Sequence, residues 1–274
     1  MNETIGAVVE GVDLATVSEE DLVGLQWALL EHHVLFFRDQ ALTTESHIAF
    51  TSRWGEVLGH PVAEALGSTD TLGRVYNDAD HPPNEGDSNF HTDYTFHSAI
   101  PDLAILRALI VPDVGGDTAW ASAGAGYDAL SPSTKERIAG LSAHHDQGPL
   151  FHREMANRYG EEIADKIAGM FPGSEHPMVV AHPVTGRPTL FVNAGYTRHV
   201  VGLPEAQSTE LLDELFKHLA DPTFQCSFAW EVGSVAIWDE HATVHRGPTD
   251  FGTATRELHR YTAGRRSPIA FSDF

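Results

Sequence analysis

The sequence predicts a mainly β protein with flanking helices, whose core is an antiparallel double-sheet barrel of the jelly-roll type. From about residue 100 onward the chain contains many short β-rich runs bounded by turn-forming residues, and only a few helical segments interrupt them. A parallel α/β sheet would need a regular alternation of strands and helices, which is absent. A Gly-x-Gly-x-x-Gly turn and a phosphate-binding loop are absent as well.

The first third of the chain predicts two helices, a strand and a long loop. A helix is expected over Ser18–His32, because Ser18 is a favourable N-cap residue and three acidic residues follow it. The apolar run Val34–Phe37 predicts a buried strand, and Thr44–Trp54 predicts a second helix. Residues 67–93 are rich in Gly, Asp, Asn and Pro, which is typical of a loop.

The remaining two thirds predict six strands and two helices. The strands are expected at Leu103–Val111, Met178–Ala181, Leu190–Val192, Phe224–Glu231, Val235–Trp238 and Leu258–Thr262, and the helices at Glu154–Met170 and Glu205–Leu219. The chain has no internal repeat, low-complexity tract or obvious linker. We therefore interpret residues 1–274 as a single domain.

Composition and charge exclude several classes of partner. Asp and Glu number 39 and Lys and Arg 17, so the net charge of -22 repels nucleic acid and anionic lipid. No apolar run approaches the ~18 residues of a membrane span, and the N-terminus lacks the pattern of a signal peptide. The single cysteine, Cys226, lies in an alternating run that predicts a buried thiol and suits a reducing compartment. We expect a cytoplasmic protein.

Seventeen histidines invite a search for a metal site. The segment around His91 and Asp93 is the first candidate, because in a strand two residues that are two positions apart point the same way. One further histidine would complete a 2-His-1-carboxylate triad, which leaves positions on an Fe(II) ion open for reactants.

A His-x-Asp tripeptide is weak evidence by itself. With 17 histidines and 19 aspartates in 274 residues, chance gives roughly one such tripeptide, and this chain has two. The second is His144-His145-Asp146. Context favours His91, which follows a long polar loop, a common way to deliver residues to the mouth of a site. The third ligand is expected from the turn after Ile237-Trp238, where His241 and His245 are both available.

Two arginines indicate an internal anion-binding site. Arg256, Leu258 and Arg260 alternate, so they share one face of an expected core strand. Arginines that face inward are costly unless they meet anions, and the planar guanidinium suits a carboxylate. An acidic chain with inward arginines therefore predicts a local trap for anions.

Together these residues resemble the taurine dioxygenase and chlorophenoxyacetate dioxygenase family of Fe(II)/2-oxoglutarate-dependent dioxygenases. The resemblance implies a double-stranded β-helix core, which is a cupin-like jelly roll. The matching segments occur in the family's order from about residue 5 to 265: Phe90–Phe96, Gly115–Trp120, His182–Gly186, Leu190–Asn193, Ile237–Asp239, His245, Arg256 and Arg260.

The resemblance also implies roles for single residues. His91, Asp93 and His245 match the catalytic iron ligands. Arg256 matches the arginine that binds the distal carboxylate of 2-oxoglutarate, and Thr118 matches a hydroxyl that assists it. The expected reaction uses Fe(II), 2-oxoglutarate and O2 to hydroxylate a small organic substrate, with release of succinate and CO2. Relatives are often dimers or tetramers, so we expect a homo-oligomer.

Several residues keep a second interpretation. Arg260 matches a second arginine that serves either the substrate's anionic group or the cosubstrate. Thr118 could be a turn hydroxyl, and Trp120 and Trp238 could simply fill the core. Asp239 could support a ligand histidine or be a surface acid at a strand end.

The candidate substrate residues lie mostly in the first hundred positions. They are His60, Tyr76, Asn77, Asp87, Tyr94, Tyr196 and Arg260, of which the tyrosines could equally be barrel wall. Asp87 stands four residues before His91, where taurine-specific relatives carry an amide. A carboxylate there would repel a sulfonate and attract an ammonium group, which argues against taurine itself. Other sulfonates, sulfate esters, aryloxyalkanoates and carboxylates remain open.

Two other classes of function are carried forward. One is a jelly-roll metalloenzyme that does not use 2-oxoglutarate, and the presence of Arg256 with Thr118 argues against it. The other is a non-catalytic protein that binds small anions, and the complete set of His91, Asp93 and His245 argues against that.

Overall fold

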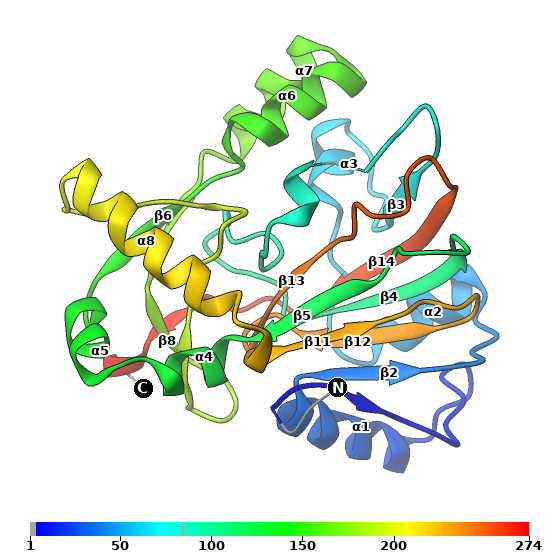
Figure 1. Ribbon diagram of the computed structural model, residues 1–274. Helices are drawn as coiled ribbons and strands as arrows, with labels where there is room; N and C mark the ends of the chain where they lie inside the picture. The colour runs from blue at the N-terminus through cyan, green and yellow to red at the C-terminus, as the bar shows by residue number, and fades with distance from the viewer. Residues whose placement is uncertain (1–3, 84, 274) are drawn as a thin grey trace.

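The computed structural model describes residues 4–83 and 85–273 of the chain, which form several sheets flanked by helices (Figure 1). The strands are β1 (Ala7–Val8), β2 (Val34–Phe37), β3 (Gly73–Asn77), β4 (Leu103–Ile110), β5 (Thr118–Ser122), β6 (Ser142–His145), β7 (Ser174–Pro177), β8 (Val179–Ala181), β9 (Pro188–Leu190), β10 (Thr197–Val200), β11 (Gln225–Phe228), β12 (Val235–Asp239), β13 (Thr243–Arg246), β14 (Arg256–Ala263) and β15 (Ile269–Ala270). The α-helices are α1 (Glu19–His32), α2 (Thr44–Ser52), α3 (Pro61–Ala65), α4 (Ala123–Ala129), α5 (Pro132–Ile138), α6 (Gly148–Tyr159), α7 (Glu161–Met170) and α8 (Glu205–Leu219). The short 3-10 helices are η1 (Glu85–Ser88), η2 (Pro222–Phe224) and η3 (Phe271–Asp273).

The largest sheet has six strands in the order β1-β2-β12-β4-β14-β3. Its neighbouring strands are antiparallel except for the parallel pair β1 and β2. Three sheets of three strands accompany it, in the orders β11-β5-β13, β10-β6-β7 and β15-β8-β9. Strands that are neighbours in a sheet are mostly far apart in sequence, so the chain crosses repeatedly between the sheets.

The strand β2 shows how the main core is divided. Val34 and Phe36 point into a cluster shared with Trp120 and Phe228 of the β11-β5-β13 sheet, and the Phe36 and Phe228 rings stack at 4.3 Å. The alternate residues of β2 point to the opposite face, where leucines of α1 cover them. The six-stranded sheet therefore packs against a second sheet on one face and against helices on the other.

Local sequence signals placed the first helices correctly. The Ser18 side chain accepts a hydrogen bond from the Asp21 N–H at the start of α1, and the left-handed residue His33 ends that helix. The helix α2 begins with a capping box at Thr43 and ends at Ser52, two residues before the expected end. The strand at Val34–Phe37 and the helix at Glu205–Leu219 are confirmed as predicted.

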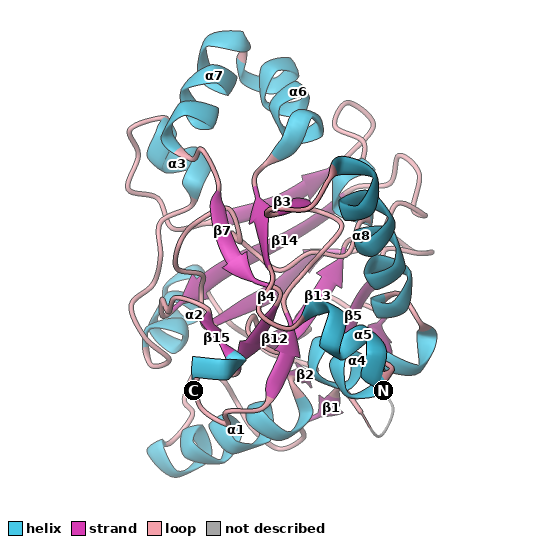
Figure 2. Cartoon of the chain, turned by 90° about the vertical axis from the view of Figure 1, so that its left-hand side faces the viewer, coloured by secondary structure: helices cyan, strands magenta, loops and turns pink. Residues whose placement is uncertain are grey.

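The prediction of one helix over Glu154–Met170 is wrong. The chain forms two helices, α6 and α7, which are separated by Gly160. Gly160 has a φ of 90°, a conformation that no α-helix contains and that glycine adopts without a Cβ clash. The two helices stand away from the sheets as a hairpin, and Ala164 and Ile167 of α7 pack against Ala65 of α3 (Figure 2).

The other strand predictions differ from the structure mainly at their ends. The strand expected at Leu190–Val192 lies at Pro188–Leu190, and the run Phe224–Glu231 contains only the short strand Gln225–Phe228. Cys226 is buried, as predicted. No helix among the described residues is long and apolar enough to cross a membrane.

Helix α2 packs against β14, the strand that carries Arg256 and Arg260, through the buried side chain of His47. The His47 side chain is fully buried and meets the Tyr261 ring edge-on at 4.7 Å. Burial and then the nearby Arg107 lower the pKa of His47 to about 3. His47 is thus neutral in the folded protein at ordinary pH.

We predict that His47 makes the protein acid-sensitive. Its folded pKa lies below its unfolded value of ~6.5, so its contribution to stability is complete above pH ~6.5 and is lost as the pH falls toward 3. Between pH 7 and pH 5 this loss amounts to about 2 kcal/mol. Urea unfolding at the two pH values should therefore show a smaller pH dependence for His47→Leu than for the wild type, by about that amount. An equal pH dependence in both proteins would contradict the prediction.

Candidate active site

Two histidines from distant parts of the chain are joined through their backbones. The His91 N–H donates to the His245 carbonyl at 2.8 Å, and the His245 N–H donates to the His91 carbonyl at 2.7 Å. His245 lies on β13, whereas His91 forms only this isolated bridge. The bridge holds the two imidazoles side by side, with ring centroids 4.3 Å apart.

The expectation that residues 91–93 form a strand is wrong. Asp93 lies in a turn after the bridge, and Tyr94 has a left-handed backbone with a φ of 58°. A hydrogen bond to β13 stabilises the turn, because the Thr92 hydroxyl donates to the Thr243 carbonyl. The carboxylate still faces the histidines, although a turn brings it there instead of strand alternation.

His91, Asp93 and His245 form a buried cluster of metal-ligand type. One potential ligand atom from each lies within 4.8 Å of the other two. The Nε2 atoms of His91 and His245 lie 4.0 and 3.9 Å from Asp93 Oδ1, too far for hydrogen bonds. The three side chains thus converge without a hydrogen bond from either histidine to Asp93.

The protonation and orientation of these groups fit a divalent metal ion. His91 Nδ1 contacts the Asn89 carbonyl at 2.9 Å, which leaves Nε2 free to face a metal. Burial, and next the neighbouring His91, hold the pKa of His245 well below its usual value, so its imidazole is neutral and can act as a ligand. Burial raises the pKa of Asp93, but Arg260, the two neighbouring histidines and Glu240 together outweigh this effect, so the pKa is lowered and the carboxyl stays ionised. Two imidazoles and one carboxylate are a donor set that suits Fe(II).

The competing histidine pairs lie elsewhere. His145 is buried, and its Nδ1 lies 3.1 Å from the Thr95 hydroxyl. His241 contacts Asp102 at 3.2 Å instead of joining the cluster. Asp239 contacts His182 at 2.9 Å, so it supports neither His91 nor His245 in the structure.

Arg256 is brought together with Thr118, as the sequence suggested. The Arg256 Nη2 donates to the Thr118 hydroxyl at 3.4 Å, and both side chains are buried. Trp230, which the sequence analysis did not single out, donates its indole N–H to the same hydroxyl at 2.9 Å. Thr118 is therefore a junction between three elements and more than a turn hydroxyl.

Arg260 lies directly beside the cluster. Its Nη1 is 2.9 Å from each carboxylate oxygen of Asp93. Burial lowers the pKa of Arg260, but Asp93 together with Tyr94, Glu240 and Tyr196 outweighs this and raises the pKa above its usual value, so the guanidinium stays charged. His259 faces away and contacts Glu257 at 3.0 Å, as strand alternation predicts.

Three of the candidate substrate residues gather around this ion pair. The Tyr196 ring lies 5.8 Å from the His91 ring, and the Tyr94 ring lies 6.4 Å from the His60 ring. The Arg260 guanidinium lies over the Tyr94 ring, 6.0 Å from its centroid. Burial, followed by the charge of Arg260, lowers the pKa of His60 to about 4, so His60 is neutral.

The other candidates differ in position. Asn77 is the cross-strand partner of Arg256, so it shares the face of that arginine. Tyr76 pairs with Glu257 on the opposite face and donates to Asp78 at 2.8 Å, so the structure does not bring it to the cluster. The Asp87 side chain lies outside the part of the chain that the structure describes, and its predicted role stays a prediction.

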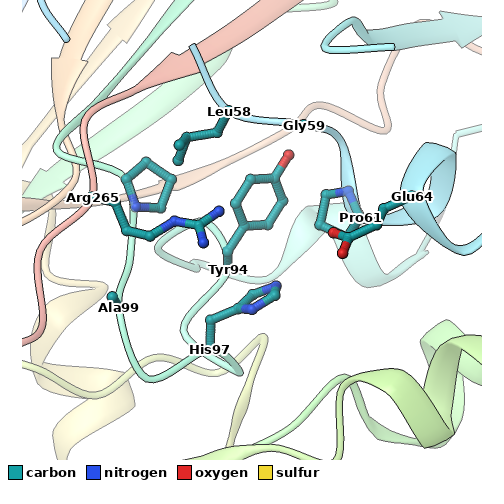
Figure 3. Close-up of a pocket in the computed structure, with 9 residues that line it drawn as sticks. Leu58, Gly59, Pro61, Glu64, Tyr94, His97, Ala99 and Arg265 are labelled. Atoms are coloured by element: carbon teal, nitrogen blue, oxygen red, sulfur yellow. The ribbon is translucent and has the colours of Figure 1, made fainter. Parts of the chain in front are cut away.

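A small hollow lies beside Tyr94, whose ring is placed between Arg265 and Pro61 (Figure 3). Its volume is about 10 Å³, close to what one water molecule needs. It is too small for an organic substrate, so we do not assign it a binding role.

Glu240 is the buried acid of the site that the sequence analysis missed. Its Oε2 accepts a hydrogen bond from the Asp93 N–H at 2.9 Å, and its Oε1 accepts one from the Trp238 indole at 2.7 Å. Burial and the charge of Asp93 raise the pKa of Glu240 well above its usual value. The signal was present, because Glu240 lies two residues after Trp238 at a strand end and so points the same way.

Comparison with known proteins gives this geometry a family. A profile of the family described as taurine catabolism dioxygenase TauD, TfdA family matches residues 1–262. The chain belongs to this family. The resemblance inferred from the sequence is thus confirmed, and a buried His-Asp-His cluster is what a TauD/TfdA-family member needs to hold iron.

Individual relatives cover nearly the whole chain. An alkylsulfatase of Acinetobacter baylyi is 32% identical over 94% of this chain and 81% of its own length. A (S)-phenoxypropionate/alpha-ketoglutarate-dioxygenase of Sphingobium herbicidovorans is 32% identical over 96% of this chain and 93% of its own. The crystal structure of a taurine dioxygenase from Burkholderia xenovorans superposes with a TM-score of 0.80 at 32% identity, over 97% of this chain and 88% of that one.

We predict that metal binding depends on His91 and not on His144, although each begins a His-x-Asp tripeptide. Adding Fe(II) and 2-oxoglutarate without oxygen should give a weak visible charge-transfer band in the wild type. His91→Ala should weaken metal binding at least about 100-fold and abolish the band, because one of three ligands is lost. His144→Ala is the matched control and should keep the band. A band that survives His91→Ala would contradict the assignment.

Proposed function

We propose that this protein is an Fe(II)- and 2-oxoglutarate-dependent dioxygenase that hydroxylates a small anionic organic molecule. In this proposal His91, Asp93 and His245 hold the iron, and Arg256 with Thr118 binds 2-oxoglutarate. The observation that carries it is the combination, in one buried region, of the His-Asp-His cluster with the Arg256–Thr118 pair. A metal cluster alone would suit many reactions, but a buried arginine held by a hydroxyl adds a place for a second carboxylate.

Different residues of the chain would bind the metal and the cosubstrate and limit access of water. Bound iron would supply the oxidising chemistry, activating O2 while 2-oxoglutarate leaves as succinate and CO2. His91 and neutral His245 present their Nε2 atoms, and Asp93 supplies the anionic protein ligand. Arg256 anchors the distal carboxylate of the cosubstrate through its guanidinium, and Thr118 fixes the orientation of that guanidinium. Burial of all these groups limits access of water, which protects reactive species from side reactions.

The expected substrate is anionic with an organic body. Arg260 supplies a fixed positive charge next to Asp93, and Tyr94, Tyr196 and neutral His60 surround it with aromatic surface. Among the relatives, one is named an alkylsulfatase and another acts on phenoxypropionate. We therefore favour sulfate esters and aryloxyalkanoates, followed by other sulfonates and carboxylates, over taurine.

The finer features of architecture and assembly belong to the same proposal. We infer that the six-stranded sheet and the β11-β5-β13 sheet, which share one core, correspond to the double-stranded β-helix of the family. We further propose a single domain over residues 1–274, a dimer or tetramer of this chain, and a cytoplasmic location. Nucleic acid and membranes are not proposed as partners, given the net charge of -22.

We predict that Arg256→Ala raises the KM for 2-oxoglutarate. Loss of a buried charged contact costs about 2 to 5 kcal/mol, so the KM should rise by at least about 30-fold while iron binding is retained. Arg187→Ala, which removes an exposed arginine from an ion pair with Asp128, is the control and should leave the KM unchanged. Succinate formation at varied 2-oxoglutarate concentrations measures both. An unchanged KM in Arg256→Ala would reassign the cosubstrate site.

We predict that succinate formation is coupled to oxidation of an organic anion. Alkyl sulfates, aryloxyalkanoates, sulfonates including taurine, and carboxylates should be compared by succinate release and oxygen uptake. At least one sulfate ester or aryloxyalkanoate should stimulate both in equal amounts, and taurine should stimulate neither. Iron binding without any succinate would favour a metalloenzyme that does not use 2-oxoglutarate, and the absence of any turnover would favour an anion-binding protein.

A further inference from the structure

We propose that Glu240 is a positioning residue that holds the Asp93 and His245 segments in one arrangement and so sets the affinity of the site for its metal. This inference rests on the proposed function, in which Asp93 and His245 are ligands. Glu240 itself is not one of the three proposed ligands. It acts through the backbone of Asp93 on one side and through Trp238 on the other.

The first contact fixes the turn that carries Asp93. Glu240 Oε2 accepts the Asp93 N–H at 2.9 Å, and the Glu240 side chain is buried, with only 1% of the residue exposed. The next residue, Tyr94, has the left-handed φ of 58° that an L-residue with a bulky side chain rarely adopts. Such a backbone persists when its surroundings determine it, and the bond to Glu240 lies one peptide before the strained position.

The second contact reaches the other ligand segment. Glu240 Oε1 accepts the Trp238 indole N–H at 2.7 Å, and the Trp238 ring lies 4.8 Å from the His245 ring. Trp238 is fully buried and also packs against Trp120 at 5.7 Å, so its position is fixed by the core. The Glu240 carboxyl group therefore links the Asp93 turn to Trp238, which packs against His245.

A third link extends the effect to the anion-binding side. The Asp93 carboxylate is paired with Arg260, and the Arg260 guanidinium in turn lies over the Tyr94 ring, 6.0 Å from its centroid. Asp93 is thus held at its backbone by Glu240 and at its side chain by Arg260. A shift of the Asp93 backbone would displace both the ligand oxygen and the arginine.

Position 240 requires a side chain with two hydrogen-bond acceptors, one for each of the two N–H groups. Glu240 receives two N–H donors from different segments, one on each oxygen, and both oxygens can accept even when the carboxyl is protonated. A glutamine has the same shape, but only one of its terminal atoms accepts, and its NH2 group would face the other N–H. A buried donor left without an acceptor is costly, so the amide would push one of the two segments away. An apolar residue could fill the space, but it would hold neither segment.

The test measures metal affinity directly, by electron paramagnetic resonance of free Mn2+, in the full-length chain. We expect Glu240→Gln to bind Mn2+ about 10- to 100-fold more weakly than the wild type, with native circular dichroism retained. Glu257→Gln is the matched control, since this carboxylate also bonds two side chains, of Arg74 and His259, but on the opposite face of β14. Its Mn2+ affinity should stay within about 2-fold of the wild type.

A rescue experiment separates positioning from a general loss of packing. Trp238→Phe removes one of the two donors, so a single acceptor then suffices at position 240. The double variant Trp238→Phe/Glu240→Gln should therefore bind Mn2+ more tightly than Glu240→Gln alone. Wild-type affinity in Glu240→Gln, or a double variant weaker than Glu240→Gln, would overturn the proposal.

Failure of this inference can be told apart from failure of the proposed function. If the wild type does not bind Mn2+, or if Asp93→Ala binds it as tightly, the metal site itself is wrong. If Asp93→Ala abolishes binding while Glu240→Gln leaves it unchanged, only the role of Glu240 is wrong. If Glu240→Gln fails to fold, Glu240→Asp gives the deciding affinity, because its shorter side chain keeps two acceptors but cannot reach both donors. It should then also bind Mn2+ more weakly, and wild-type affinity would overturn the proposal.

Discussion

The backbone exchange between His91 and His245 is the constraint on which the site depends. Each residue donates its N–H to the carbonyl of the other, so a loop from the first third of the chain is locked to β13 near the end. His245 is in turn held opposite Trp120 of β5, whose first residue is Thr118. His245 and Thr118 thus belong to one sheet, and Arg256 reaches Thr118 from β14 of the six-stranded sheet, so the two sheets together position the proposed iron and 2-oxoglutarate residues.

The buried charges of Asp93, Arg260 and Arg256 are better explained by function than by a contribution to stability. Ion pairs in a protein interior rarely add stability, because desolvation costs as much as the pairing returns. Asp93 and Arg260 are nevertheless buried together, and Arg256 lies nearby behind Thr118. A chain with a net charge of -22 has no need of inward arginines for solubility. A divalent cation and organic anions meeting at this point give each of these charges a partner.

The sequence predicted those parts of the fold that local chemistry decides. The cap at Ser18 and the apolar run Val34–Phe37 depend on neighbours within a few residues, and both were located correctly. The break at Gly160 was missed, because glycine is tolerated inside helices and only its φ of 90° shows that the helix ends there. The strand expected at His91–Asp93 failed for a related reason. The bonds that shape this turn come from Thr243 and Glu240, far away in the chain.

The same limit applied to the site, where the sequence identified the residues that carry chemistry but not the residues that position them. His91, Asp93, His245, Arg256 and Arg260 carry chemistry in their own side chains, so spacing and family resemblance could select them. Trp230 and Glu240 act through their hydrogen bonds to Thr118 and Trp238. A sequence does not show which distant group a side chain will contact. Asp239 illustrates the difficulty, since it lies next to Glu240 yet contacts His182. On a strand, adjacent residues face opposite ways. In the structure Glu240 lies on the side of Trp238 and Asp239 bonds His182 instead, and alternation does not indicate the partner of either acid.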